Sequence, residues 1–490
     1  MSETVTAASD AAAARIGEVE ARSAAFRKEL RLADLVLIQI LYVVGSGWVG
    51  TAAKLGTAHL VFWLLAIALY YLPQAAVVIY LNRLLPLEGG LYQWATLALG
   101  KFAGFLVAWN LWAYTILIMA TFAVVVATNL SYLLGPGFAA LTGAWWYTGA
   151  VSIAMICGIT LVALLGLRVG KWVQDIGGVA QILTFAALVA IPFVALRRGT
   201  IPAYHPLAAS VPRATPLSLN IFGKMALGAF SGFEYVAILA GECRSPARTI
   251  SRSVLIAVPV IALMFILGTS SVLALVPPDR IDLVSPIPQT LSLGFQGLGF
   301  ARMIVPLLIF LLVLRQLGSV TLIFAGNTRL PMVAGWDGLL PKWFTRLDPR
   351  FRTPRNSILF VAALTLLLSL AGQAGVGIQE AFQLLENAAG IFYAFTYLAL
   401  FAIPLVAASR LPERPPLWLR AAAAAGFAVS LLYSVLSIFP IIDVASWQVF
   451  AAKILAVLAG ANLLGVAIYA GARRVGAAEA SGEAQPVVEG

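Results

Sequence analysis

Charged residues are scarce in this chain. They make up 11% of its 490 residues, whereas soluble domains carry roughly 25%. Hydrophobic residues make up 61%, and the mean hydropathy is +0.93. This composition excludes an ordinary soluble domain. The apolar runs are continuous and helix-length rather than alternating, so a β-barrel is excluded as well and membrane-spanning helices are predicted.

Cysteine and histidine are also rare, with two of each. Cys157 lies in an apolar run and Cys243 in the polar stretch ECRSP, so we expect neither a disulfide framework nor a metal or cofactor site. His59 and His205 fall near predicted span ends, where an interfacial side chain is favoured over a proton relay. Phosphate-binding Gly-Lys-Ser/Thr loops and zinc-type His-Glu-x-x-His helices are missing from the sequence. We therefore expect no enzyme.

Twelve apolar segments predict about twelve transmembrane helices. They lie at 32–54, 58–82, 101–131, 145–166, 172–196, 217–240, 253–276, 301–328, 357–372, 382–408, 418–440 and 446–470. The first thirty residues are polar and lack the apolar core of a secretion signal. Most Lys and Arg residues fall on the side of both ends, which predicts cytoplasmic termini in the cell membrane. The net charge of +11 is thereby explained by cytoplasmic loops, without nucleic acid.

Two spans contain glycine-rich weak points at corresponding places. Gly45-Ser46-Gly47 lies early in the first span, and Ser231-Gly232 lies in the sixth. Because five spans separate them, the second copy is inverted, as in transporters built from inverted repeats. The predicted organisation is an all-α membrane protein with a cytoplasmic tail (1–30), a first five-helix repeat (31–198), a second, inverted repeat (215–408), two extra helices (409–474) and a cytoplasmic tail (475–490).

A helix broken in hydrocarbon leaves backbone groups unpaired, so it persists only around a polar cavity. If the first span stops at Gly45, the amides of Ser46 and Gly47 begin a second half-helix with partial positive charge, which suits a carboxylate. Carbonyls released at Val43, Val44 and Ser231 suit an ammonium group. One site with both features fits a zwitterion. Close helix packing at small residues is the simpler alternative for each break alone.

Two charged residues are expected inside the membrane. Glu234, just after the second break, is interpreted as a gating or proton-coupling residue, or else as a hydrogen-bond acceptor that ties span six to a neighbour. Arg315 is predicted to be the one basic residue at mid-membrane, because Lys224 is assigned to the outer side. Arg315 would either supply a fixed charge at a cation site or pair with Glu386 or Glu234.

Four stretches together resemble amino-acid permeases of the amino acid–polyamine–organocation superfamily, from about Leu30 to Arg474. They are the Gly45-Ser46-Gly47 break, PLEGGLY from Pro86, FSGFEYVAILAGECRSPARTISRSV from Phe230 and NTRLPMVAGWDGLLPKWFTRLDPRFRTP from Asn327. The resemblance implies a five-plus-five inverted repeat of the leucine-transporter type.

The resemblance also implies roles for single residues. The substrate carboxylate would meet the amides of Ser46 and Gly47, and the ammonium the carbonyls of Val43 and Ser231. The set expected to bind substrate is Val43, Gly45, Ser46, Gly47, Phe230, Ser231, Gly232 and Phe233. The set expected to act in gating or coupling is Glu234, Arg315 and Gln181.

The chain departs from the family pattern at two places. Gly228 stands where many relatives have a bulky aromatic gate, so either a larger substrate fits or another ring forms the gate. Gln181 stands where some proton-coupled relatives have a lysine, and glutamine cannot carry that proton. An exchanger or uniporter is therefore as plausible as a proton symporter.

The leading hypothesis is a secondary transporter that moves an amino acid or related amine through the lipid bilayer by alternating access, with a proton as the candidate coupling ion. The alternatives are a polyamine or other organic-cation permease and an amino-acid sensor with a transporter fold. Little chain lies outside the predicted spans to form a signalling domain.

Overall fold

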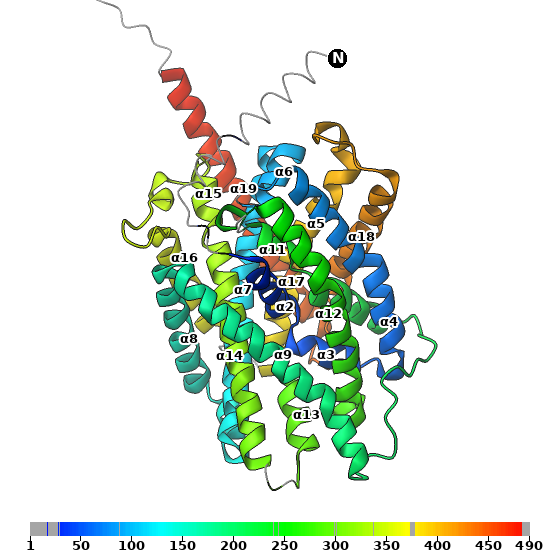
Figure 1. Cartoon of the computed structure of the whole chain (residues 1–490). Coiled ribbons are helices and arrows are strands. Elements are labelled where there is room, and N and C mark those ends of the chain that lie inside the picture. The colour runs from blue at the N-terminus through cyan, green and yellow to red at the C-terminus, as the bar shows by residue number, and fades with distance from the viewer. Residues whose placement is uncertain are drawn as a thin grey trace, which may run out of the picture.

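The computed structural model describes Gly17, Lys28 and residues 30–87, 89–238, 240–243, 245–297, 299, 301–336, 338–372 and 378–482. These residues form a bundle of long helices (Figure 1). The α-helices are α2 (Leu32–Val43), α3 (Ser46–Ala53), α4 (His59–Ala66), α5 (Leu72–Leu84), α6 (Leu91–Leu99), α7 (Lys101–Leu134), α8 (Trp145–Leu165), α9 (Leu167–Arg197), α10 (Pro216–Gly223), α11 (Phe233–Ile238), α12 (Pro246–Leu275), α13 (Pro286–Gly294), α14 (Ala301–Asn327), α15 (Leu330–Trp336), α16 (Arg355–Gly372), α17 (Ile378–Val406), α18 (Leu417–Leu436) and α19 (Trp447–Gly482).

Short 3₁₀ and π turns interrupt or connect these helices. The two π turns are η2 (Ile67–Tyr71), between α4 and α5, and η4 (Lys224–Ala229), between α10 and α11. The 3₁₀ turns are η1 (Gly56–Ala58), η3 (Pro136–Gly143), η5 (Ala240–Glu242), η6 (Pro278–Arg280), η7 (Lys342–Thr345) and η8 (Ala408–Arg410). π turns often occur at functional sites, so η4 draws attention to the sixth predicted span.

The described helices agree with the predicted spans. Ten are long and apolar enough to cross a membrane, and the bent pair α2 and α3 would make an eleventh. The shorter apolar stretch Arg355–Leu370 in α16 matches the ninth predicted segment. The chain is thus an all-α protein with the length and hydropathy of a polytopic membrane protein.

The long helices pack around the broken ones. α14 runs along α9, α17 lies between α7 and α18, and α12 packs on α2. Figure 1 places α2 and α11 in the middle of the bundle, with α8 at one side and α4 and α18 at the other. The interior is therefore built around the two spans that the sequence marks as weak.

The segment before α2 is anchored to the start of α12. Leu30 is fully buried and forms a β-bridge with Cys243, and the Lys28 ammonium donates a hydrogen bond to the Gly241 carbonyl. Lys171 of α9 forms an ion pair with Asp34 of α2, with 2.7 Å between nitrogen and oxygen. These contacts tie together three helices at the end of the bundle from which α19 also emerges (Figure 1).

Candidate substrate site

The first predicted break is present. α2 ends at Val43, α3 begins at Ser46, and their axes differ by 43°. Gly45 has extended backbone angles and provides no side-chain cap for α3. A Cβ atom at Gly45 would lie 2.5 Å from the Trp48 ring, so only glycine fits there. The first amides of α3 have no intrahelical partners, as at every helix start. They remain available to a ligand.

The second interruption differs in form. Ser231 and Gly232 are non-helical, between the π turn η4 and α11, but the span from Pro216 to Ile238 is not sharply bent. Gly232 has φ +139°, and a Cβ atom there would lie 2.2 Å from the Tyr42 ring. Both its backbone conformation and its contact with α2 therefore require glycine.

Side chains already satisfy the polar groups of this second interruption. The Gly232 amide donates to the Tyr397 hydroxyl at 2.8 Å, and the hydroxyls of Ser231 and Tyr70 are 2.6 Å apart. In the alternative amide orientation, Gln74 donates to the Phe230 carbonyl at 2.8 Å. Neighbouring helices thus bond to most polar groups of this interruption, whereas the start of α3 lies at a cavity.

A cavity of about 80 Å³ with several polar groups in its wall lies between the two interruptions. That volume has room for several water molecules. The described lining residues are Tyr42, Val43, Gly45, Ser46, Gly47, Trp48, Tyr114, Ile118, Thr121, Phe122, Val125, Gly228, Ser231, Val284, Arg315, Gln316, Ser319, Ile323, Phe382, Glu386 and Tyr393. The structure therefore brings together six residues predicted for the site, namely Val43, Gly45, Ser46, Gly47, Ser231 and Arg315.

Arg315 of α14 reaches across to the first break. One guanidinium nitrogen donates to the Val44 carbonyl at 2.7 Å, and another lies 2.6 Å from the Gln316 amide oxygen and 3.5 Å from the Ser46 hydroxyl. Its side chain is 3% exposed. Among the described residues, neither Glu234 nor Glu386 forms an ion pair with it. The expected ion pair is therefore not formed with either of these two residues, and the fixed-charge role stays a prediction.

The carbonyls of Val43 and Val44, which were expected to be free for an ammonium group, already accept hydrogen bonds. Val44 accepts from Arg315, and Val43 accepts from the Gly45 amide at 2.9 Å. A bound cation would therefore compete with existing donors at the end of α2. Glu386 is the only carboxylate among the described cavity-lining residues, so it offers the alternative acceptor.

Glu234 is fully buried and lies behind the described lining of the cavity. Its carboxylate accepts hydrogen bonds from the hydroxyls of Tyr393 and Tyr397, both on α17. Tyr393 itself lines the cavity and stacks on Tyr114 with ring centroids 4.3 Å apart. Glu234 thus ties span six to α17, as the structural alternative predicted. Because Tyr393 both bonds to Glu234 and lines the cavity, it connects the Glu234 carboxylate to the cavity through one hydrogen bond.

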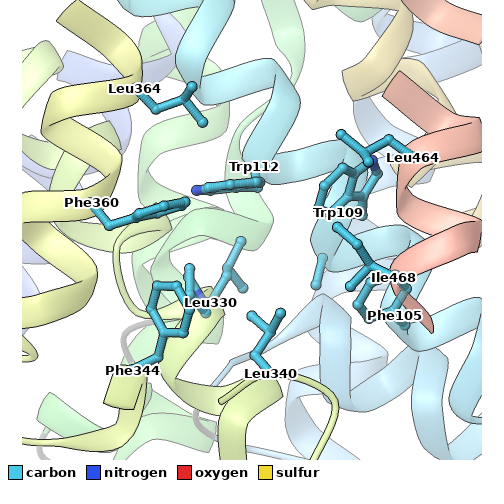
Figure 2. Close-up of a pocket in the computed structure, with 12 residues that line it drawn as sticks. Phe105, Trp109, Trp112, Leu330, Leu340, Phe344, Phe360, Leu364, Leu464 and Ile468 are labelled. Carbon is cyan, nitrogen blue, oxygen red and sulfur yellow. The ribbon is translucent and has the colours of Figure 1, made fainter. Parts of the chain in front are cut away.

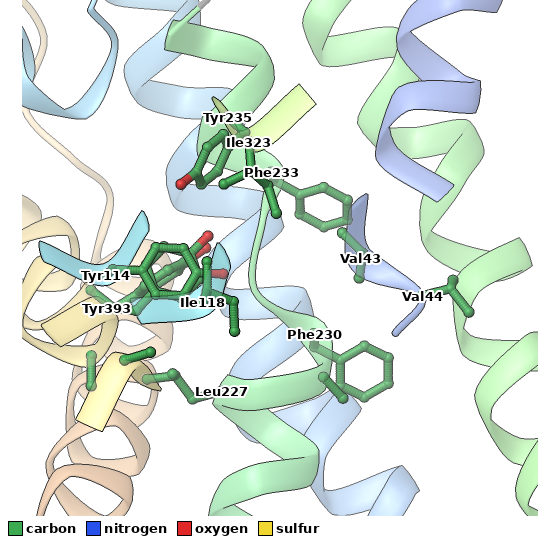
Figure 3. Close-up of a cluster of buried hydrophobic side chains, with 14 of the residues drawn as sticks. Val43, Val44, Tyr114, Ile118, Leu227, Phe230, Phe233, Tyr235, Ile323 and Tyr393 are labelled. Atoms are coloured by element: carbon green, nitrogen blue, oxygen red, sulfur yellow. The ribbon is translucent and has the colours of Figure 1, made fainter. Parts of the chain in front are cut away.

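The remaining predicted site residues lie outside the described lining. Phe230 and Phe233 are fully buried and stack on Tyr71, with centroids 4.1 and 5.2 Å apart. Figure 3 shows both rings on the side of Val43 and Val44, away from Tyr114 and Tyr393. They belong to the apolar core in this conformation, and their contact with substrate stays a prediction.

Gln181 of α9 is also fully buried, and neither polar atom of its side chain has a hydrogen-bond partner among the described residues. Its proposed coupling role stays a prediction. His59 is buried near the start of α4 and is satisfied by the Gly56 carbonyl at 2.9 Å and the Ser270 hydroxyl at 3.1 Å. His205 lies exposed in the segment between α9 and α10.

Trp48 fills the space left by the missing aromatic side chain at position 228. A Cβ atom on Gly228 would lie 2.6 Å from the far edge of the Trp48 ring. Both residues line the cavity. The ring therefore comes from the first break rather than the second. Sequence reasoning left open whether another ring replaces the gate, and Trp48 is in position to do so.

Lys224 corrects the prediction that Arg315 is the one basic residue at mid-membrane. Rather than lying on the outer side, Lys224 is fully buried in η4. Its ammonium donates to the Asn387 side-chain oxygen and interacts electrostatically with Glu386, both on α17. Its place inside the apolar run IFGKMALGAF was the signal that could have identified it.

A family model described as "Amino acid permease" matches residues 30–461. An uncharacterised transporter of Legionella pneumophila is 24% identical over 391 residues, 79% of this chain and 83% of the relative. The branched-chain amino acid permease of Bacillus subtilis is 22% identical over 74% of this chain and 80% of its own length. A Lactococcus lactis protein named "Probable agmatine/putrescine antiporter" is 24% identical over 69% and 70%.

Among solved structures, MhsT in complex with L-phenylalanine superposes with a TM-score of 0.61. The match covers 84% of this chain and 98% of MhsT at 14% sequence identity. At that identity the likeness establishes the fold, which is the leucine-transporter type expected from the sequence.

Proposed function

Because the chain belongs to the amino acid permease family, we propose that it moves its substrate by alternating access through the cavity between the two interruptions. It is an integral membrane protein and a secondary transporter of an amino acid or related amine. The observation that carries the proposal is the meeting of Ser46, Gly47, Arg315 and Glu386 in the wall of one cavity.

The cavity offers an anion-binding pole at the start of α3. The free amides of Ser46 and Gly47 carry the partial positive charge of a helix start, and the Arg315 guanidinium lies beside the Ser46 hydroxyl. Arg315 cannot lose its charge under physiological conditions. We assign the substrate carboxylate to this pole.

The cation-binding pole is assigned to Glu386 together with the Ser231 carbonyl, so the substrate ammonium would share the Glu386 carboxylate with the buried Lys224 ammonium. Supporting this, the carbonyls of Val43 and Val44 already accept hydrogen bonds. A zwitterion would bridge the two poles. An agmatine- or putrescine-like amine, which lacks a carboxylate, would use Glu386 and leave the start of α3 to solvent. If binding requires a carboxylate at the anion-binding pole, the substrate is an amino acid; if it does not, the substrate is an amine without a carboxylate.

For coupling, Arg315 takes the role of a permanent cation, so transport should not require sodium. The transport cycle is then driven either by a proton or by a counter-transported amine. If a proton drives it, Glu234 is the proposed proton carrier. Glu234→Gln should flatten the pH dependence of uptake and leave exchange intact. Tyr393→Phe keeps the carboxylate and removes the donor that connects it to the cavity, so it should shift the pH dependence rather than remove it. A full pH response in Glu234→Gln would assign coupling elsewhere.

Orientation and repeat boundaries are proposed from the charge distribution. The basic loops place both ends in the cytoplasm, with the protein in the plasma membrane and the repeats at 31–198 and 215–408. Cysteine-accessibility labelling of Ser2→Cys in intact and permeabilised cells tests this, with Cys157 and Cys243 replaced by Ala. Labelling of intact cells would contradict the orientation.

The deciding experiment combines binding and flux. Thermal stability of the purified protein would be screened against the twenty amino acids, agmatine and putrescine, because a specific ligand raises stability by mass action. The stabilising compound would then be followed into reconstituted vesicles as labelled substrate. We expect saturable uptake and recovery of the compound unchanged, since no covalent step is proposed. Stabilisation without flux would refute transport and identify a sensor.

A further inference from the structure

An apolar hollow lies apart from the substrate site. It measures about 280 Å³, and twelve apolar residues of α7, α15, α16, α19 and the segment after α15 line it. For scale, an engineered apolar cavity of about 150 Å³ holds one benzene molecule. Figure 2 shows Trp109 and Trp112 of α7 between Phe360 of α16 and Leu464 of α19.

The hollow opens sideways between α16 and α19. Leu464 is 56% exposed and Phe360 40% exposed, whereas Phe105 and Leu330 at the inner wall are each 2% exposed. In a membrane-spanning bundle this opening faces lipid rather than water. From Phe105 to Trp112 the hollow follows two turns of α7, which is about 10 Å along the helix. Its elongated shape follows the direction of the bundle.

Hydrogen bonds and ring stacking fix the positions of α7, α16 and α19 relative to one another. The Trp109 indole donates to the Ala461 carbonyl at 2.8 Å, and Asn110 donates to Asn462 at 3.0 Å, so α7 and α19 are held together behind the hollow. Across it, Trp112 and Phe360 stack with centroids 5.8 Å apart. Because these walls cannot easily close on the space, an apolar occupant is favoured over collapse.

Three basic residues lie close in sequence to the lining residues at one end of the hollow. Lys101 begins α7, one turn before Phe105, and Lys342 lies between the lining residues Leu340 and Phe344. Arg473 follows Ile468 by about one and a half turns of α19. All three basic residues are exposed. Basic pockets beside spanning helices attract anionic headgroups.

We propose that this hollow binds one acyl chain of an anionic phospholipid, whose headgroup phosphate is held by Lys101, Lys342 and Arg473. The chain enters between Phe360 and Leu464 from the leaflet next to the basic loops. The lipid would hold α16 and α19 against α7. The assignment concerns the membrane-facing surface and does not depend on the identity of the transported substrate.

The test measures lipid retained by the purified full-length protein with native mass spectrometry, after exchange into detergent with phosphatidylglycerol or phosphatidylcholine. We expect one tightly retained phosphatidylglycerol, with at least a threefold lower retained fraction in Leu464→Phe, which narrows the opening. Leu463→Phe is the matched control, since Leu463 is 70% exposed on the same helix and lies outside the described lining.

Replacing Lys101 and Lys342 together with Gln should reduce phosphatidylglycerol retention to the level of phosphatidylcholine. Equal retention of both lipids by the unaltered protein, or equal retention by Leu464→Phe and Leu463→Phe, would overturn the proposal. If the unaltered protein proves dimeric in the same spectra, loss of the dimer in Leu464→Phe with unchanged lipid retention would also overturn the proposal and assign the hollow to a second copy of the chain. No transported substrate is present, so the outcome is independent of the transport proposal.

Discussion

The two interrupted spans resemble each other in sequence but differ in how their polar groups are satisfied. At the first, Gly45 separates two helices bent by 43°, and the start of α3 opens onto the cavity. At the second, Tyr397 and Tyr70 bond to Gly232 and Ser231. A pair of symmetric glycine breaks thus gives one end that can bind charge and one that is held by aromatic hydroxyls.

The charges around the two breaks differ in the same way. Arg315 joins the first break from α14 through a carbonyl contact, so its charge stays at the cavity. At the second, Lys224 lies one π turn before the interruption and contacts Asn387 on α17. We therefore expect the first break to contact substrate and the second to transmit a conformational change between η4, α11 and α17.

The largest effect is expected from filling the first break. Gly47→Leu places a branched side chain at the start of α3 and should abolish substrate binding, measured as ligand-dependent thermal stabilisation. Gly47→Ala is the matched control, because a Cβ atom there meets its nearest neighbour, the Leu283 carbonyl oxygen, at 3.5 Å. Near-normal affinity in Gly47→Leu would remove the role of the α3 start.

Removing Arg315 should have the next largest effect. Hydrogen bonds to charged groups contribute about 1.5–3 kcal/mol, and each 1.4 kcal/mol is about tenfold. We therefore expect Arg315→Ala to reduce uptake roughly 10- to 100-fold, with Arg315→Lys intermediate because lysine keeps the charge without the fork of donors. Uptake in sodium-free and sodium-containing buffer should be equal in the unaltered protein. A strict sodium requirement would contradict the fixed-charge role.

The same comparison shows what sequence could predict. Span positions and both interruptions follow from local features, namely long apolar runs and paired glycines, and these were confirmed. The partner of Arg315 and the burial of Lys224 were not predicted, because they depend on how helices more than a hundred residues apart pack. Phe230 and Phe233 were expected beside substrate. The π turn η4 precedes them and changes the helix face on which following residues lie.

Lys224 offers a test of the second break. A buried charge that loses its partner is strongly destabilising, whereas replacing both partners with neutral groups is often tolerated. Lys224→Met should therefore lower the melting temperature by several degrees, because the buried Glu386 carboxylate loses the nearby positive charge, and Lys224→Met combined with Glu386→Gln should restore most of it. Glu413→Gln is the control, because Glu413 forms a surface ion pair with Arg83. Equal loss in the single and double variants would show that the two charges are not coupled.

The smallest effect is expected where the two breaks touch. Trp48 of α3 packs over Gly228 of η4. The aromatic ring thus comes from the first interrupted span, and the space that it fills belongs to the second. Trp48→Ala should raise the KM for uptake several-fold by leaving the cavity without its ring. Adding Gly228→Phe to that variant supplies a ring from the other side and should recover part of the loss, while Gly228→Phe alone should clash with Trp48 and impair uptake. If the combined variant is no better than Trp48→Ala, the ring must act from α3, and the two breaks are not interchangeable as sources of the gate.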